Sequence, residues 1–309
     1  MQKYVLKRLL LIVPILLGVS IIVFLILNLT PGDPGRIILG PTATQEAVDT
    51  LNEKYGFYDP LPVKFFNYIK DAVMGDFGES YRSGQPVFEE IMKRMPITLR
   101  LLILSLFLGT LIGIPIGILS AVKQYSTLDI TSSVFAMAIA SIPSFWLGFM
   151  CILLFSVKLK MLPVSGLESW TGYILPVGIM AIGQVATMIR LTRSSMLDVV
   201  RLDYVRTARA KGVVEKRVIF VHALRNALIP IVTVIGTSFA RGVGGTILIE
   251  TVFGIQGVGT LMLDAINNKD IPVVMGGVLF LSAVFALCNL GVDLLYGFLD
   301  PRIKAQYAK

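Results

Sequence analysis

Residues 203–230 read DYVRTARAKGVVEKRVIFVHALRNALIP and lie between two long apolar stretches of a 309-residue chain. Within this segment, Val205 and Ala208 fall on one face of a helix, whereas Arg206 and Arg209 fall on another. The spacing therefore predicts a short amphipathic helix with a basic outer face.

The helix is expected to end at Gly212, because glycine adopts the left-handed conformation that closes many helices. A second amphipathic stretch follows, with Val214, Val218 and Val221 on one side. Two short helices that meet at a glycine would form a compact knob, suited to transmitting a push from a partner protein. Composition alone favours the alternative, a basic segment that lies on anionic lipid.

The chain on both sides of this segment has the composition of a membrane protein. Hydrophobic residues make up 55% of it and charged residues 16%, whereas soluble domains average about 25% charged. Six runs are long and apolar enough to cross a bilayer. They cover residues 9–29, 97–119, 131–157, 173–189, 229–249 and 273–295. We expect an all-α integral membrane protein with six transmembrane helices, the third kinked at Pro143.

The distribution of charge predicts the orientation of these spans. With the N-terminus inside, the inner segments hold sixteen basic and five acidic residues, and the excess of Lys and Arg marks the cytoplasmic side. Both termini are then cytoplasmic. The net charge of +8 is accounted for without nucleic acid as a partner. The first run is interpreted as a retained anchor, because it is longer than the apolar core of a signal peptide.

This reading divides the chain into four parts. They are an anchor (1–29), an extracytoplasmic helical loop (30–96), a transmembrane domain (97–297) with a cytoplasmic loop at 190–228, and a cytoplasmic tail (298–309). The outer loop is either a docking surface or gate, or a small cap that connects two spans.

Three helices are expected in the outer loop. In the first, Thr42 and Gln45 are spaced as a capping box, and Gly56 follows as a stop. Its apolar stripe comprises Val48, Leu51 and Tyr55. The second helix covers 61–74 and ends at Gly75, and the third covers 87–95 and stops at Pro96.

Few residues in or near the spans are candidates for metal binding, catalysis or contact with a substrate. Cys151 and Cys288 are interpreted as small core residues, and His222 is the single histidine, so no metal site is expected. The glycines Gly242, Gly244 and Gly245 favour close helix packing. Alternatively, Gly242 and Gly245 line a translocation path together with Arg241, which could equally face a partner helix. No nucleotide-binding loop or catalytic cluster is found, so the chain is not expected to be an enzyme.

The quoted segment resembles the coupling motif of permease subunits of ATP-binding-cassette importers, in the form typical of the dipeptide, oligopeptide and nickel branch. Arg206 and Thr207 stand where the general motif has Glu and Ala, as is usual in that branch. Further likenesses follow in order along the chain. They are 4–10 (YVLKRLL), 30–34 (TPGDP), 75–86 (GDFGESYRSGQP), 250–253 (ETVF) with 257–259 (GVG), and 293–296 (DLLY) with 300–302 (DPR).

The resemblance implies the type I importer permease fold and a set of partners: a second homologous permease, two cytoplasmic ATPases that carry ATP and Mg, and an extracytoplasmic solute-binding protein. No cofactor is expected on this chain. The resemblance also implies an ATPase-coupling site with Gly212 as its turn and 215–225 as a lever into the fifth span. Its residues are Asp203, Tyr204, Val205, Arg206, Thr207, Ala208, Arg209, Ala210, Lys211, Gly212 and Glu215.

The implied function is import of dipeptides or oligopeptides by alternating access, in a multi-pass protein of the bacterial or archaeal cell (inner) membrane. Nickel chelates and glutathione are alternative cargoes of similar-looking permeases. A stand-alone secondary transporter is a further alternative, although the broken helices in two matching halves and the mid-membrane carboxylates of such proteins are not visible.

Overall fold

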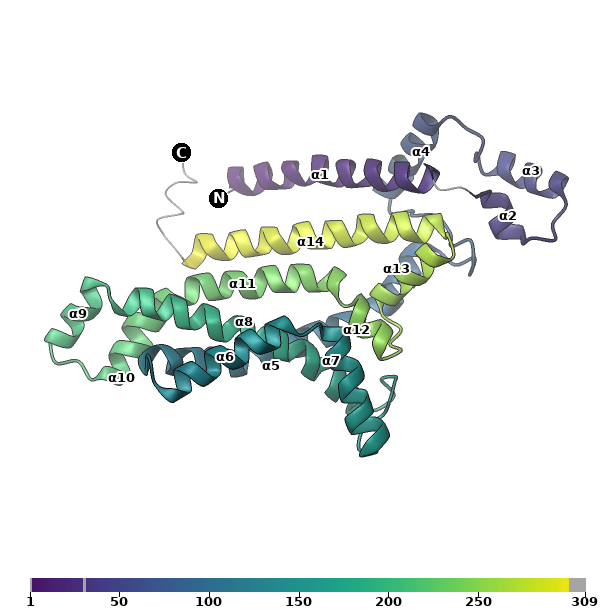
Figure 1. The fold of residues 1–309 in the computed structure, drawn as a ribbon. Coiled ribbons are helices and arrows are strands. Elements are labelled where there is room, and N and C mark those ends of the chain that lie inside the picture. Colours follow the sequence, from purple (N-terminus) through teal and green to yellow (C-terminus); the bar gives the residue numbers. More distant parts are fainter. Residues whose placement is uncertain (1, 30–31, 300–309) are drawn as a thin grey trace. The chain divides into compact units, whose positions relative to one another are not determined.

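A computed structural model describes residues 2–29 and 32–299. Its helices, in chain order, are α1 (Gln2–Leu29), α2 (Pro34–Leu39), α3 (Gln45–Lys54), α4 (Leu61–Val73), α5 (Val87–Val122), α6 (Thr127–Ser141), α7 (Ser144–Cys151), η1 (Ile152–Lys158), η2 (Trp170–Tyr173), α8 (Ile174–Val200), α9 (Asp203–Ala210), α10 (Glu215–Arg217), η3 (Val218–Ala223), α11 (Leu224–Gly245), α12 (Ile247–Val252), α13 (Val258–Asn267) and α14 (Ile271–Leu299). Within the described ranges no β-strand forms. The chain is all-α, as its composition predicts (Figure 1).

The expected membrane spans are present as helices. In the described part of the chain, five helical runs are long and apolar enough to cross a membrane, or six if one bent pair counts as a span. The bent pair is α6 followed by α7 and η1, with an angle of 96° between its halves. Pro143 lies at the break, and Ile142 before it is extended (φ −92°, ψ 125°). A residue before proline avoids the α-helical region, so the predicted kink at Pro143 is confirmed.

Two helices extend beyond their predicted ends. The helix expected to stop at Pro96 continues, because α5 runs unbroken through this residue. A proline inside a helix costs about 3 kcal/mol, but Ile91 and Leu101 on either side of it are fully buried and each contributes about 2 kcal/mol of apolar burial. The fourth span continues past Ile189 to Val200, so the first part of the predicted cytoplasmic loop is helical.

The chain forms two compact units. Of the described residues, the first unit contains 97–256 and 287–299; the second contains Gln2–Pro96 and Gly257–Ala286. The four-part division expected from the sequence remains a prediction. The predicted tail begins inside α14, and its residues 300–309 lie outside the described residues, as do Thr30 and Pro31.

In the first unit, α8 lies at the centre of the packing and contacts α6, α7 and α11. Its close neighbour α5 presents three glycines at four-residue intervals, Gly109, Gly113 and Gly117. A Cβ atom at each would come within 2.5 to 2.6 Å of a Cβ atom of α8. Glycine therefore lets the two helix backbones approach closely, which is how many membrane helices pack.

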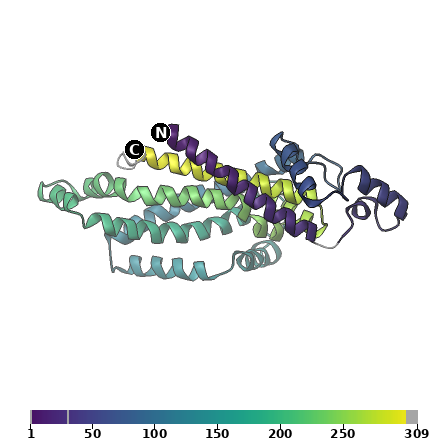
Figure 2. The same cartoon turned by 90° about the horizontal axis from the view of Figure 1, so that it is seen from above.

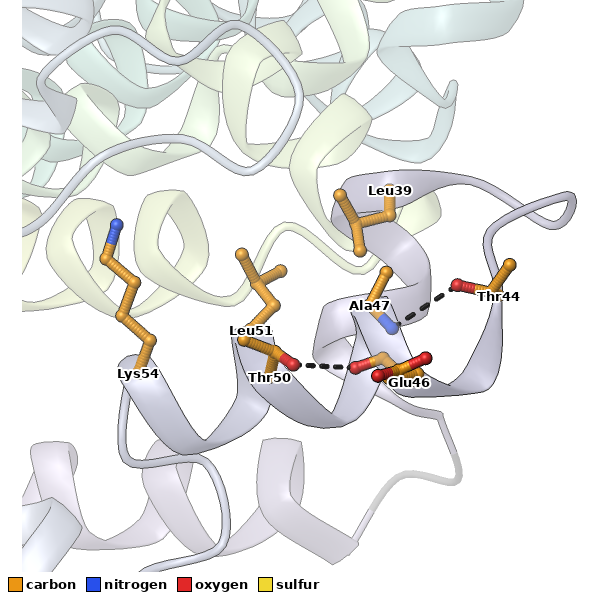
Figure 3. Close-up of a pocket in the computed structure, with 7 residues that line it drawn as sticks. All are labelled: Leu39, Thr44, Glu46, Ala47, Thr50, Leu51 and Lys54. Carbon is orange, nitrogen blue, oxygen red and sulfur yellow. Dashed lines mark hydrogen bonds between the residues drawn. The ribbon is translucent and has the colours of Figure 1, made fainter.

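In the second unit, the outer-loop helices α2 and α3 form a small sub-structure. The predicted capping box of Thr42 and Gln45 is wrong: Thr44 caps α3, Gln45 is the first helical residue, and the Thr44 hydroxyl accepts a hydrogen bond from the Ala47 amide at 3.4 Å. Thr44 directly precedes the first helical residue, where its side chain reaches the third amide. Leu39, Ala47 and Leu51 line a shallow, open pocket of about 400 Å³ between the two helices (Figure 3).

The rest of the outer-loop prediction is mostly confirmed. In the predicted stripe Val48 is fully buried, but Tyr55 is exposed. Gly56 and Gly75 have positive φ angles and follow the ends of α3 and α4 as expected. Gly276 of α14 packs against Phe77 and Val87, so this end of α14 is held by residues of the outer segment.

Candidate ATPase-coupling site

The quoted segment forms a helical hairpin in the first unit. Helices α9 and α10 lie at one end of α8 and α11 in both views (Figure 1, Figure 2). Val205 of α9 is fully buried, whereas Arg206 and Arg209 are exposed, as the amphipathic pattern predicts. The Thr207 hydroxyl donates a hydrogen bond to the Asp203 carbonyl at 2.9 Å, within the same helix.

Gly212 closes α9 in the left-handed conformation, with φ +75°. Its amide donates to the Arg209 carbonyl at 2.9 Å, and the Val213 amide donates to the Ala208 carbonyl at 3.3 Å. These two bonds define a Schellman motif, which satisfies carbonyl groups left without partners at a helix end. The predicted turn at Gly212 is confirmed as local structure.

An exposed ion pair bridges the two helices on either side of the Gly212 turn. The Arg209 guanidinium donates to both Glu215 carboxylate oxygens, Nε to Oε2 at 3.1 Å and Nη2 to Oε1 at 2.7 Å. The hydrogen bond that Arg209 donates to Glu215 raises the pKa of Arg209. Both side chains are exposed to more than a third, so screening by water limits the contribution of the pair. The bidentate geometry nonetheless links α9 to α10.

Tyr204 ties α9 to the chain that follows. Asn226 of α11 donates to the Tyr204 hydroxyl at 2.6 Å, and this hydroxyl donates weakly to the His222 carbonyl at 3.4 Å. The sequence pattern did not reveal these bonds, because the partners lie 22 and 18 residues away. Tyr204 thus links α9 to the start of α11, in addition to the turn at Gly212.

The second stretch is buried on a different face from the predicted one. Val218 is buried, but Val214 is 73% exposed and Val221 is 52% exposed. Ile219, Ala223 and Ala227 face inward instead and pack on Met196 of α8. The prediction used α-helical register. Residues of η3 wind as a π-helix instead, which moves their side chains to other faces. From Glu215 the helical run continues without interruption into the span as far as Gly244.

An ion pair with a buried carboxylate and a half-buried guanidinium lies in the helices that carry this hairpin. Arg193 of α8 donates to Asp129 of α6, Nε to Oδ1 at 2.5 Å and Nη2 to Oδ2 at 2.8 Å. The carboxylate also accepts from the Ser120 hydroxyl and, at 2.9 Å, from the Tyr125 amide. The Asp129 side chain is only 3% exposed. The four donors join α6 and α8 to the end of α5. Sequence reasoning missed the pair, counting Arg193 and Asp129 only as inner-side charges.

The predicted path residues lie apart from the hairpin, toward the other end of α11. Gly242 packs against Leu102 of α5, since a Cβ atom there would meet Leu102 Cδ1 at 2.2 Å, in keeping with close helix packing. Arg241 is exposed, and its Nε donates to the Thr237 carbonyl at 3.4 Å. Gly245 is the last residue of α11. Their role in a path remains a prediction.

Glu250 differs from its sequence interpretation. Its position directly after the fifth apolar run predicts an acid on the outer side, yet Glu250 is fully buried in α12 and accepts hydrogen bonds from Thr98 at 2.7 Å and Thr246 at 2.8 Å. Thr246 lies four residues earlier on the chain and could have been noticed from the spacing. Thr98 lies 152 residues away and could not.

The apolar helices and the glycine-closed hairpin fit a membrane transport subunit, and comparison with known families identifies the class of protein. The sequence profile of the family described as "Binding-protein-dependent transport system inner membrane component" matches residues 113–305. The corresponding N-terminal profile, "Binding-prot-dependent transport system membrane comp, N-term", matches residues 1–102. The chain belongs to this family of importer permeases.

Individual relatives agree with this assignment. The Glutathione transport system permease protein GsiC of Salmonella choleraesuis (strain SC-B67) is 44% identical over 304 residues, which cover 98% of this chain and 99% of the relative. The protein of the same name from Escherichia coli (strain K12) is 43% identical over the same length. Among solved structures, the inward-facing MetNI methionine ABC transporter aligns with a TM-score of 0.56 and 19% identity, covering 68% of this chain and 96% of that one.

These comparisons confirm the resemblance to permease subunits of ATP-binding-cassette importers, and the fold is the type I importer permease fold. The protein is a multi-pass membrane subunit of a transport system. The family's own description names dependence on a binding protein.

Proposed function

We propose that this chain is the translocating subunit of an ATP-driven importer of short peptides, with glutathione as the favoured cargo. The support is the 44% identity, over nearly the full length, to a permease named for glutathione transport. Glutathione is itself a tripeptide, so it falls within the substrate class that the coupling motif implies. Dipeptides, longer peptides and nickel chelates remain alternative cargoes.

Uptake into proteoliposomes tests the cargo. The complex is reconstituted with its solute-binding protein, ATP is enclosed, and radiolabelled glutathione, a dipeptide and nickel are offered in separate reactions. We expect ATP-dependent accumulation of glutathione, which an excess of unlabelled glutathione abolishes. Accumulation of nickel alone would contradict the peptide assignment.

We also propose that residues 203–212, with Glu215, dock into a cytoplasmic ATPase, which carries ATP and Mg and performs the hydrolysis. The observation that supports this role is the hairpin itself: α9 is closed at Gly212, held by Arg209–Glu215 and Tyr204–Asn226, and continuous with a membrane-spanning helix. Such a unit passes a displacement from the membrane surface into the span. A hairpin that merely lay on lipid would need none of these ties.

Purification separates this function from that of a stand-alone secondary transporter. The importer requires co-purification of two ATPases and of a second, homologous permease, and uptake must stop when the ATPases are omitted. Transport of peptide by the chain without any ATPase would contradict the proposal.

The outer segment is proposed to contact the solute-binding protein through residues 79–86. The Ser80 hydroxyl and the Tyr81 amide donate to the Asp270 carboxylate at 2.5 and 3.1 Å, which anchors this turn and leaves Arg82 exposed. Crosslinking from Tyr81→Cys or Arg82→Cys tests the contact. Because Tyr81 is half-buried, Arg82→Cys is the better probe. If crosslinks from both positions never reach the binding protein, the proposal fails.

A further inference from the structure

Helix α4 is attached to a membrane-spanning helix within the second unit. The ring of Phe65 on α4 meets the ring of Phe24 on α1 edge to face, with centroids 5.2 Å apart. Phe24 belongs to the apolar run Arg8–Leu29, and α4 lies beside the end of α1 (Figure 1). Phe24 is five residues before Leu29, which places it about 7 Å inside the end of the helix. This contact therefore holds α4 at the depth of the outermost turns of a span.

The face of α4 turned away from this contact is apolar and exposed. Val63 is 44% exposed, Phe66 69%, Val73 83% and Met74 69%. At about 100° per residue these four side chains, the last of them on the residue that caps α4, fall within an arc of about 100°. We refer to them as the α4 apolar face. The opposite side carries Phe65 and Ala72, of which Ala72 is buried.

The charges of α4 suit the surface of a bilayer. Lys70 lies within the arc of the α4 apolar face and is exposed. Its long aliphatic stem can cover apolar surface while the ammonium group reaches the headgroups. Asp71 lies outside the arc and is also exposed. An aromatic residue such as Phe66, beside a lysine, is typical of helices at the membrane interface.

The surroundings of α1 identify what covers the α4 apolar face. Only 11% of the apolar window of α1 is buried inside the protein. Ile22, Ile26 and Leu29, which lie on the same turns as Phe24, are 60%, 59% and 77% exposed. Acyl chains are the solvent for such a surface. Because α4 packs on these turns, its own apolar residues lie where the same solvent reaches.

We propose that α4 is an interfacial helix that lies in the leaflet in which α1 ends, with Val63, Phe66, Val73 and Met74 in contact with lipid. Interfacial helices bury their apolar face about 5–10 Å into the boundary between headgroups and acyl chains, and the position of Phe24 gives the same depth. The lipid contact fixes the base of the outer segment on the membrane. It depends on the chain being a membrane protein and is independent of the proposed cargo.

Spin-label accessibility in the reconstituted complex tests this contact. With Cys151→Ser and Cys288→Ser as background, single cysteines are introduced as Phe66→Cys or Val73→Cys and labelled with a nitroxide in lipid nanodiscs. Oxygen concentrates in the acyl region, whereas a nickel chelate stays in water. We expect both sites to be several-fold more accessible to oxygen, relative to the chelate, than Asp71→Cys on the same helix. They should match Leu25→Cys on α1.

Two results would overturn the proposal. If Phe66→Cys and Val73→Cys are as accessible to the chelate as Asp71→Cys, the face lies in water. If both reagents are excluded, or become excluded only when the solute-binding protein is added, a protein covers the face instead. Unchanged oxygen accessibility after addition of the binding protein supports the lipid contact. Because two separate sites are labelled, a folding defect at one of them leaves the test intact.

Discussion

At Gly212 the backbone conformation, rather than the space around the residue, limits which side chain the chain can accept. No heavy atom lies within 4 Å of a Cβ atom built at this position, yet φ is +75°. An L-residue in this conformation costs about 1–2 kcal/mol, and a β-branched residue is disfavoured further. A substitution here therefore acts on the turn and leaves the packing of the spans unchanged.

We predict that Gly212→Val weakens ATPase association and uptake, while membrane insertion and yield stay unchanged. Co-purification of the ATPases in pull-down experiments measures the effect. Gly75→Val is the matched control, because Gly75 also has a positive φ (+87°) with open space around it, but lies in the outer segment. ATPase binding by Gly212→Val at the level of Gly75→Val would argue against the coupling role.

At Asp129 and Arg193 the surroundings, rather than the backbone conformation, limit substitution, because the Asp129 carboxylate is buried. Removing Arg193 alone leaves a buried carboxylate without two of its donors, which typically costs about 3–5 kcal/mol. We predict that Arg193→Gln lowers the thermal unfolding midpoint of the purified complex. The double variant Asp129→Asn/Arg193→Gln should recover much of the loss, because it removes the charge and keeps hydrogen-bonding groups. Equal midpoints for the single variant and the unmodified protein would contradict this prediction.

At the scale of elements, the contact between α5 and α8 depends on three positions without side chains. A Cβ atom at Gly113 would lie 2.5 Å from Met188 Cβ and 3.0 Å from the Val185 carbonyl oxygen. Since the latter is backbone, the helices themselves must separate. We predict that Gly113→Val destabilises the protein by about 1–3 kcal/mol, read as a lower unfolding midpoint. Gly178→Ala is the control on α8, where no atom lies within 4 Å. A similar loss in both variants would refute the close-packing explanation.

The outer-loop helices α2 and α3 are joined through one carboxylate. Asp33 accepts hydrogen bonds from Asn52 Nδ2 at 2.8 Å and from the Gly35 amide at 3.0 Å. The Asn52 bond, together with the backbone amides and Arg36, lowers the pKa of Asp33. The ionised form is therefore favoured in the folded state. Its contribution to stability is present above the ordinary pKa and is lost as pH falls through the lowered value.

We predict that protection of the α2–α3 backbone against hydrogen exchange, corrected for intrinsic rates, decreases as pH falls below about 4. In Asp33→Asn the protection should be lower at neutral pH and nearly independent of pH in this window. Mass spectrometry of peptides from residues 34–54 measures both. Identical pH profiles for the two proteins would show that another group is responsible.

For the molecule as a whole, the number of membrane crossings decides on which sides the termini lie. In the part of the chain that the structure describes, the candidate spans number six if the bent pair α6–α7 counts as one, which would put both ends on the same side, and five if that pair is re-entrant. We predict the former, with both ends cytoplasmic. Tags fused to the two ends should both be inaccessible to protease in intact cells and accessible in inverted vesicles. Tags on opposite sides would show that the bent pair does not cross.

Features that depend on neighbouring residues could be predicted from the sequence, whereas contacts between distant segments could not. The apolar runs and the Gly212 turn depend on neighbouring residues, so hydropathy and glycine placement are enough to predict them. Ser120, Asp129 and Arg193 come together only when three helices pack, and the same holds for Thr98 and Glu250. Pairs of this kind leave no periodic pattern in one chain.

Two misses have other causes. The glycines on α5 do form a regular small-residue motif, and its signal was available in the sequence beside the less regular cluster at 242–245. The inward face of η3 was predicted in α-helical register, and its π-helical winding placed Ile219 inward rather than Val221.

The 96° break at Pro143 has a consequence for how the protein is made. Helix α6 has 15 residues and spans about 22 Å at 1.5 Å per residue, which is short of the roughly 30 Å hydrocarbon layer. Neither half of the pair can leave the translocon as an independent spanning helix. Its main packing partner, α8, is synthesised later. We therefore expect integration of this segment to be completed only when α8 arrives, which would make the order of synthesis part of the assembly of the bundle.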